Sequence, residues 1–263
     1  MPEFTAQDVK SLRDATGAGM MDCKKALTEA DGDRDKAARI LREKGLSKVA
    51  TLEDRENNQG AIAIVSDERG AALVELKSET DFSAKSADFV ALAQKMAEAV
   101  LADGPDAVAG LAEDLDTLKI SKKENIELGT VARVEAVDGR ILDAYLHVQD
   151  GRGTNGVIIE LDGGTVEQAH EIALHCAFAK PSALSRDEID AALVENARSG
   201  FEELTRKEGK PEQAVPKIVE GRLNAWYAER VLPEQGLCGE KATVQQKLGD
   251  VTITRFVQAV IGS

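Results

Sequence analysis

The junction at residues 78–85 constrains the fold more than any other stretch, because the spacing of apolar residues changes there. Before it, the run Ala71–Lys77 alternates apolar and polar residues as a β-strand does. After it, apolar residues recur at helical spacing, namely Phe89, Leu92, Ala93, Met96, Ala97 and Val100. Residues 78–85 are therefore predicted to be a short loop between a strand and an amphipathic helix.

This loop has an unusual composition. Phe82 lies among Ser78, Glu79, Thr80 and Asp81, although aromatic residues make up only 3% of the chain. One interpretation is structural: Thr80 or Asp81 caps the helix, and Phe82 folds back onto it as a hydrophobic staple. The other is functional: a carboxylate and an aromatic side chain are presented to a partner on a rigid scaffold. The loop alone does not separate the two.

The N-terminal part of the chain is predicted to form three short helices. Thr5 and Asp8 have the spacing of a capping box, and Asp33 is placed to cap the third helix. Gly45 stands where a glycine commonly ends a helix. The candidates for exposed side chains in this module are Arg13, Met20, Met21, Lys24 and Lys25. Two adjacent methionines cannot both point inward on a short helix, so at least one is expected to contact a partner.

Six runs are predicted as strands, and two tight turns, at Asp67–Gly70 and at Asp138-Gly139, join pairs of them. The predicted strands are Gly60–Val65, Ala71–Lys77, Val131–Val137, Ile141–Val148, Val157–Leu161 and Thr252–Ile261. Further helical patterns lie at Asp106–Leu115, Lys122–Ile126 and Val166–Ala179.

Residues 183–230 are predicted to be two antiparallel helices about a turn at Gly209–Pro211. Apolar residues three and four apart form one stripe between Ile189 and Leu204 and a second between Ile218 and Tyr227. Pro216 must lie in the first turn of the second helix or kink it. The hairpin is either a surface structure whose stripes cover each other, or a protruding arm for dimerisation or partner contact.

Together these elements predict an α+β fold. It consists of an N-terminal three-helix module, a core of two subdomains built from antiparallel sheets with helices, and an inserted antiparallel helical hairpin. The predicted boundaries are 1–46 for the module, 47–58 for a polar linker, 59–140 for the first core subdomain, 141–182 with 231–263 for the second, and 183–230 for the hairpin.

Two apparent motifs do not predict a site. Gly151–Gly156 matches GxGxxG, but a strand pattern follows it where a dinucleotide site needs a helix, so we interpret its glycines as a hairpin loop. His170, His175 and Cys176 are not spaced to share one helix face as metal ligands do, and are expected to be ordinary helix residues. No nucleophile–base pair or carboxylate dyad is recognisable either. We therefore expect no metal, no cofactor and no enzymatic activity.

Composition narrows the partners. The net charge of −14 disfavours direct binding of nucleic acid, and no apolar run is long enough to span a membrane. Met1–Phe4 lacks the features of a signal peptide, and three widely spaced cysteines argue for a reducing compartment, so a cytoplasmic location is expected.

Two stretches carry a resemblance to a known family. The run from Leu12 to Leu27 (LRDATGAGMMDCKKAL) resembles the N-terminal signature of bacterial elongation factor Ts, and Glu79–Phe82 (ETDF) resembles its second signature. Later segments match as well, including Glu220–Leu223, so the resemblance covers essentially the whole chain. It implies a guanine-nucleotide exchange factor that binds elongation factor Tu carrying GDP, and a hairpin that serves a homodimer or a two-to-two complex.

The resemblance also implies roles for individual residues. Thr80, Asp81, Phe82 and Ser83 would dislodge Mg²⁺ from the partner. Contacts with the GTPase domain of the partner would come from Arg13, Met20, Met21 and Lys24, and with its C-terminal domain from His147. The family usually has valine at position 83, and we expect the serine here to weaken the apolar wedge and to act as a helix cap.

Two other classes of function remain open at this point. In a binding adaptor, the three-helix module, which resembles a ubiquitin-associated fold, would bind a partner without changing nucleotide release. In an enzyme, Gly151–Gly156 would serve as a phosphate loop, and the isolated chain would bind a nucleotide.

Overall fold

A computed structural model of the chain describes residues 4–262, so residues 1–3 and 263 of the predicted terminal units lie outside the described residues. The α-helices are α1 (Ala6–Thr16), α2 (Met20–Glu29), α3 (Arg34–Val49), α4 (Asp81–Ala84), α5 (Ala87–Asp103), α6 (Ala112–Lys122), α7 (Val166–Ala179), α8 (Ala191–Lys207), α9 (Val215–Ala228) and α10 (Val244–Leu248). The strands are β1 (Gln59–Asp67), β2 (Gly70–Ser78), β3 (Glu127–Glu135), β4 (Arg140–Gln149), β5 (Arg152–Asp162) and β6 (Thr252–Val260). The predicted α+β fold is confirmed.

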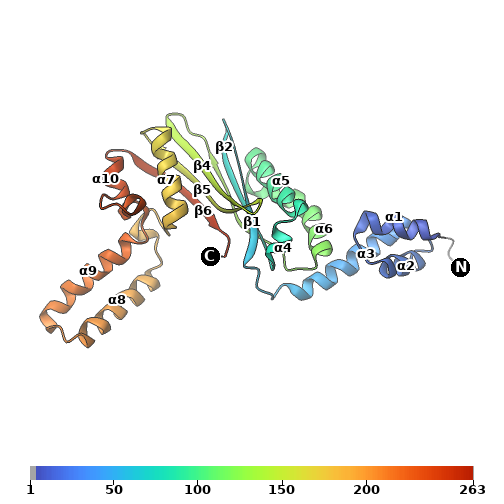
Figure 1. Cartoon of the computed structure of the whole chain (residues 1–263), viewed down its shortest axis with the longest axis horizontal. Coiled ribbons are helices and arrows are strands. Elements are labelled where there is room, and N and C mark those ends of the chain that lie inside the picture. Colours follow the sequence, from blue (N-terminus) through green and yellow to red (C-terminus); the bar gives the residue numbers. More distant parts are fainter. Residues whose placement is uncertain (1–3, 263) are drawn as a thin grey trace.

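The N-terminal helices begin where their caps predict. Thr5 and Asp8 form a complete capping box on α1, and the Asp33 side chain accepts a hydrogen bond from the Lys36 amide at the start of α3. The helices enclose a small core of their own, made by Val9, Leu12, Cys23, Ala26, Leu27, Ala30, Ala37 and Leu41. Figure 1 shows this module at one end of the molecule, beyond α6.

The prediction that Gly45 ends the third helix is wrong. The helix α3 continues to Val49, and a short 3-10 turn follows, so the predicted linker begins as helix. A side chain at position 45 would approach Ile120 of α6 within 2.9 Å. Glycine therefore lets α3 pack closely on α6, where Arg42 pairs with Glu113 and Asp116.

The sheet has two antiparallel halves. One half has the order β3-β2-β1, and the other places β5 between β4 and β6. They join where β1 pairs with β5 at Ile62 and Gly153. Helix α5 covers the first half and α7 the second, each over its own buried core. A further cluster, which contains Ile62, Leu73 and Ile158, packs the opposite faces of the two halves against each other.

The glycines of the GxGxxG run correct one prediction. Gly151 forms the β4–β5 turn with a φ of 78°, but Gly153 and Gly156 lie inside β5 rather than in a loop. A Cβ at Gly153 would lie 2.2 Å from the Ile62 carbonyl oxygen, and one at Gly156 would lie 2.8 Å from the Ile62 side chain. These two glycines allow the half-sheets to approach, and they offer no phosphate loop.

The segment before β3 also differs from its prediction. Helix α6 ends at Lys122, and Lys123 adopts a left-handed conformation with a φ of 58°. Residues 123–126 are therefore not helical, and β3 begins at Glu127, four residues earlier than predicted. This non-helical segment lies beside α4.

The helical hairpin projects from the second half of the sheet, away from the N-terminal module (Figure 1). Pro216 lies in the first turn of α9, which is one of the two possibilities expected from the sequence, the other being a kink. The stripe of α9 is buried at Val219 and Leu223, and Val215 is buried before it. The stripe of α8 is only partly covered, because Leu193 and Leu204 remain exposed. The hairpin therefore presents apolar surface on α8.

Candidate functional site

The four residues Thr80–Ser83, which we call the tip, form the junction between β2 and α5. Thr80 caps the single turn α4, since its hydroxyl accepts a hydrogen bond from the Ser83 amide at 3.2 Å. Thr80 therefore caps a helix as the structural interpretation required, but the helix is the separate turn α4, whereas the amphipathic helix α5 begins after Ser86. The staple half is wrong, because the Phe82 side chain is 85% exposed and does not fold back. A large aromatic residue in that position is available to a partner.

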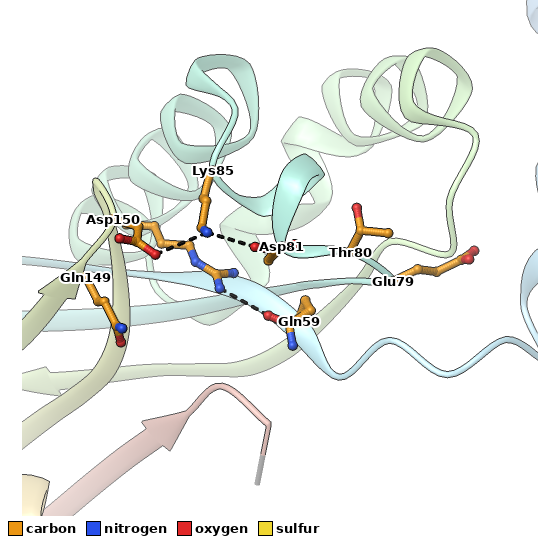
Figure 2. A pocket seen from close by; sticks show the side chains of 8 residues that line it. Gln59, Glu79, Thr80, Asp81, Lys85, Gln149 and Asp150 are labelled. Carbon is orange, nitrogen blue, oxygen red and sulfur yellow. Dashed lines mark hydrogen bonds and ion pairs between the residues drawn. The ribbon is translucent and has the colours of Figure 1, made fainter.

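The carboxylate of Asp81 is held beside the β4–β5 turn. Lys85 Nζ lies 2.7 Å from Asp81 Oδ2 and 3.1 Å from Asp150 Oδ2, so one ammonium bridges the tip and the turn (Figure 2). The hydrogen bond from Lys85, together with its charge, lowers the pKa of Asp81. Hydrogen bonds to both carboxylates raise the pKa of Lys85. Asp81 and Lys85 are therefore both charged at neutral pH, and the tip carries an anion at the residue before Phe82.

A shallow hollow surrounds this bridge, with Gln59, Glu79, Gln149 and Arg152 completing its lining. Arg152 is buried and donates hydrogen bonds to the Gly60 carbonyl and, at 3.1 Å, to Gln59 Oε1. The guanidinium thus ties the beginning of β5 to the beginning of β1. Through this contact and the Lys85 bridge, the second half of the sheet supports the tip that the first half carries.

Ser83 does not take the position that the sequence predicts. Its side chain is 3% exposed, and its hydroxyl donates a hydrogen bond to Glu124 Oε1 at 2.6 Å. It caps no helix, since Thr80 caps α4 and α5 follows Ser86. The expectation that the serine weakens an exposed wedge therefore loses its basis, because residue 83 points inward. Sequence patterns gave no signal for Glu124, which lies 41 residues from Ser83.

The candidate residues of the N-terminal module are exposed on two helices, α1 and α2. Met20 and Met21 are 53% and 64% exposed. Helix geometry required that at least one of the two methionines be exposed, and both are. Arg13 and Lys24 are exposed as well. Figure 1 places α1 and α2 apart from α4, so these side chains are not brought together with the tip.

His147 lies nearer to the tip in the fold than its sequence position suggests. It is exposed near the end of β4, which ends at Gln149 and leads into the β4–β5 turn. The Tyr145 hydroxyl lies 3.4 Å from its Nδ1. Val148 is exposed next to it, and Asp150 of the same turn contacts Lys85. The β4–β5 turn that follows His147 thus reaches Lys85 beside the tip.

The other candidate ligands are separately occupied. His170 pairs with Asp143 at 3.1 Å, whereas the buried His175 ring lies 2.9 Å from Gln235 Oε1 and accepts a hydrogen bond from the Cys238 amide. Within residues 4–262, no three His, Cys, Asp or Glu side chains are grouped so that they could hold a metal ion. No helix in that range is long and apolar enough to cross a membrane.

Comparison with known proteins agrees with this architecture. A family model described as elongation factor TS matches residues 79–263, a range that includes the tip, β3, the second half of the sheet and the hairpin. The molecule is thus a translation elongation factor. Curated relatives named elongation factor Ts match nearly the full length: 40% identity for Deinococcus radiodurans (98% of this chain, 99% of that protein), 43% for Cutibacterium acnes (98% and 99%) and 42% for Mycobacterium avium (100% and 99%). The chain belongs to the elongation factor Ts family.

Proposed function

We propose that the chain is a guanine-nucleotide exchange factor that acts in the cytoplasm on elongation factor Tu. It binds the GDP form of this GTPase, promotes release of GDP and is itself not an enzyme. The observation that carries the proposal is the tip: an almost fully exposed phenylalanine beside a charged aspartate, on a one-turn helix supported by both halves of the sheet.

The chemistry of a GTPase explains why such a tip promotes release. A P-loop GTPase holds its nucleotide through loop amides, a helix N-terminus, a lysine and Mg²⁺. Mg²⁺ requires nearly ideal octahedral oxygen geometry, so a small displacement of its surroundings weakens its binding. In this proposal Phe82 enters between elements of the partner, and Asp81 disturbs the groups around the ion.

Magnitudes limit what the tip does alone. Burial of one phenylalanine contributes about 1.5–3 kcal/mol, whereas a shift of a two-state equilibrium from 1:99 to 99:1 requires about 5.5 kcal/mol. The remainder has to come from other contacts. We assign these to Arg13, Met20, Met21 and Lys24 on the GTPase domain of the partner, and to His147 on its C-terminal domain. Because linkage is reciprocal, GDP must weaken binding of the factor as much as the factor weakens binding of GDP.

The helical hairpin has a separate role in this proposal. Leu193 and Leu204 are exposed on α8, which supports contact with a partner or a second copy of the chain. A homodimer, or a two-to-two complex with elongation factor Tu, would cover this apolar surface. The net charge of −14 gives no support for nucleic acid as a direct ligand.

The experiment measures loss of a fluorescent GDP analogue from elongation factor Tu after mixing with the factor. We expect Phe82→Ala to slow release by about tenfold to a hundredfold, the equivalent of the apolar burial that it removes, and Asp81→Ala to slow it as well. Phe178→Ala is the matched control, because that phenylalanine is 78% exposed on α7, which covers the second half of the sheet, whereas the tip belongs to the first half. Equal rates for Phe82→Ala and the parent would refute the proposal.

The same assay separates the alternatives. An adaptor would show weaker binding of Phe82→Ala to the partner with no change in the release rate at saturation. An enzyme with its own nucleotide site would retain the fluorescent GDP in the absence of elongation factor Tu, and the position of Gly153 and Gly156 within β5 argues against this outcome.

A further inference from the structure

A carboxylate outside the tip accepts three hydrogen bonds from it. Glu124 Oε2 accepts from the Thr80 amide at 3.2 Å, while Glu124 Oε1 accepts from the Thr80 hydroxyl at 2.7 Å and from the Ser83 hydroxyl at 2.6 Å. Thr80 and Ser83 are also bonded to each other. The two residues that Glu124 holds therefore stand on either side of Asp81 and Phe82.

The segment that carries Glu124 is itself fixed on both sides. Lys122 Nζ pairs with Asp88 Oδ1 in the first turn of α5 at 2.7 Å. The Asn125 amide donates a hydrogen bond to Glu79 Oε1 at 2.7 Å. This bond joins the residue that follows Glu124 to the residue that precedes the tip. A side chain on a segment fixed in this way orients its partners rather than moving with them.

The tip needs such support because it has little of its own. Helix α4 has four residues, which is too short to be stable in isolation. Phe82 is almost fully exposed, so no core contact orients it. The Lys85 bridge joins exposed groups, and exposed ion pairs of this kind hold a conformation only weakly. Three hydrogen bonds converge on the Glu124 side chain, and the two from hydroxyl groups are short, so together they are the stronger restraint.

We propose that Glu124 is a positioning residue for the tip, and that its carboxylate fixes Thr80 and Ser83 so that Asp81 and Phe82 project in one direction. This inference rests on the proposed exchange function. It also assigns a role to Ser83, whose hydroxyl joins the tip to Glu124 instead of contacting the partner. Positioning of this kind changes the rate of a step that needs exact placement more than it changes overall affinity.

The test compares GDP release over a range of factor concentrations for three glutamate variants. We expect E124A to lower the maximal release rate by about tenfold, while the half-saturating concentration stays within about twofold. E124Q keeps an oxygen that accepts from both hydroxyls and loses only the acceptor for the Thr80 amide, so we expect it to remain within about threefold of the parent. E127A is the matched control, because Glu127 bonds to Asn57 and makes no hydrogen bond to the tip.

A second series tests the hydroxyl that Glu124 holds. We expect Ser83→Ala to slow maximal release by about threefold in the parent and to have no further effect in E124A, because the bond is already absent there. Thermal unfolding establishes that each variant is folded at the assay temperature. If E124A is not, Ser83→Ala decides the question, and a parental rate for that variant then overturns the proposal.

Phe82→Ala in the same series keeps the two proposals distinguishable. Slow release with Phe82→Ala but a normal maximal rate with E124A overturns only the positioning role. The same role is overturned if E124A and Ser83→Ala effects multiply, or if E124A changes the half-saturating concentration alone. A normal rate with Phe82→Ala overturns the exchange function itself.

Discussion

Gly156→Ala tests the packing of the two half-sheets, on which the support of the tip depends. A Cβ at this position would lie 2.8 Å from Ile62 Cγ2 and 3.1 Å from both Ile64 Cδ1 and Leu73 Cδ1. Real Cβ contacts do not become as short as the one with Ile62, and the two others are tight; Ile62 and Leu73 belong to the cluster between the halves, and Ile64 packs against it. The added methyl group must therefore displace packed side chains, and overpacking of this kind costs about 1–3 kcal/mol.

For a chain of this size, each kcal/mol lowers Tm by about 2–4 °C, so we expect a fall of about 2–12 °C. Thermal unfolding followed by circular dichroism measures it. Gly221→Ala is the matched control, since Gly221 lies within α9 and no atom would lie within 4 Å of its Cβ. There alanine favours the helix by about 0.5–1 kcal/mol, so Tm should rise slightly.

Two stability measurements test this packing of the half-sheets. A Gly156→Ala variant as stable as the parent would refute the close approach of the half-sheets. Combination with Ile62→Ala provides a second measurement, because it removes the side chain nearest to the added methyl group. The two substitutions together should cost less than the sum of their separate effects, as expected for residues in contact.

Burial lowers the pKa of His175, so the unfolded chain binds this proton more readily, and stability should fall as the pH drops below about 6.5. Urea unfolding at about pH 7.5 and about pH 5.5 checks this, and the fall should be smaller in His175→Asn. Lys85→Met should return the pKa of Asp81 toward about 3.9, as an NMR titration would show; an unchanged pKa contradicts the bridge. Cys238 is exposed, whereas burial raises the pKa of Cys176, so a thiol reagent should modify Cys238 first and Cys176 only after unfolding, as mass spectrometry would detect.

Local patterns predicted most of the elements. The capping pair Thr5 and Asp8 begins α1, the proline at position 216 lies in a first turn, and the strands around Asp67–Gly70 pair in full register. Each of these depends on residues a few positions apart, whose conformational preferences act before any distant contact forms. The errors at Gly45 and at residues 123–126 occurred where packing on another element overrides a local preference.

The tip shows the same division within one site. Its place between a strand and a helix, its cap and its unusual Phe82 follow from neighbouring residues, and the family signature drew attention to it. The inward direction of Ser83, the contact with Glu124 and the bridge from Lys85 to Asp150 join residues 41 to 65 positions apart. Such contacts exist only in the folded chain, because hydrogen bonds and ion pairs act over a few ångströms in space, whatever the separation along the chain.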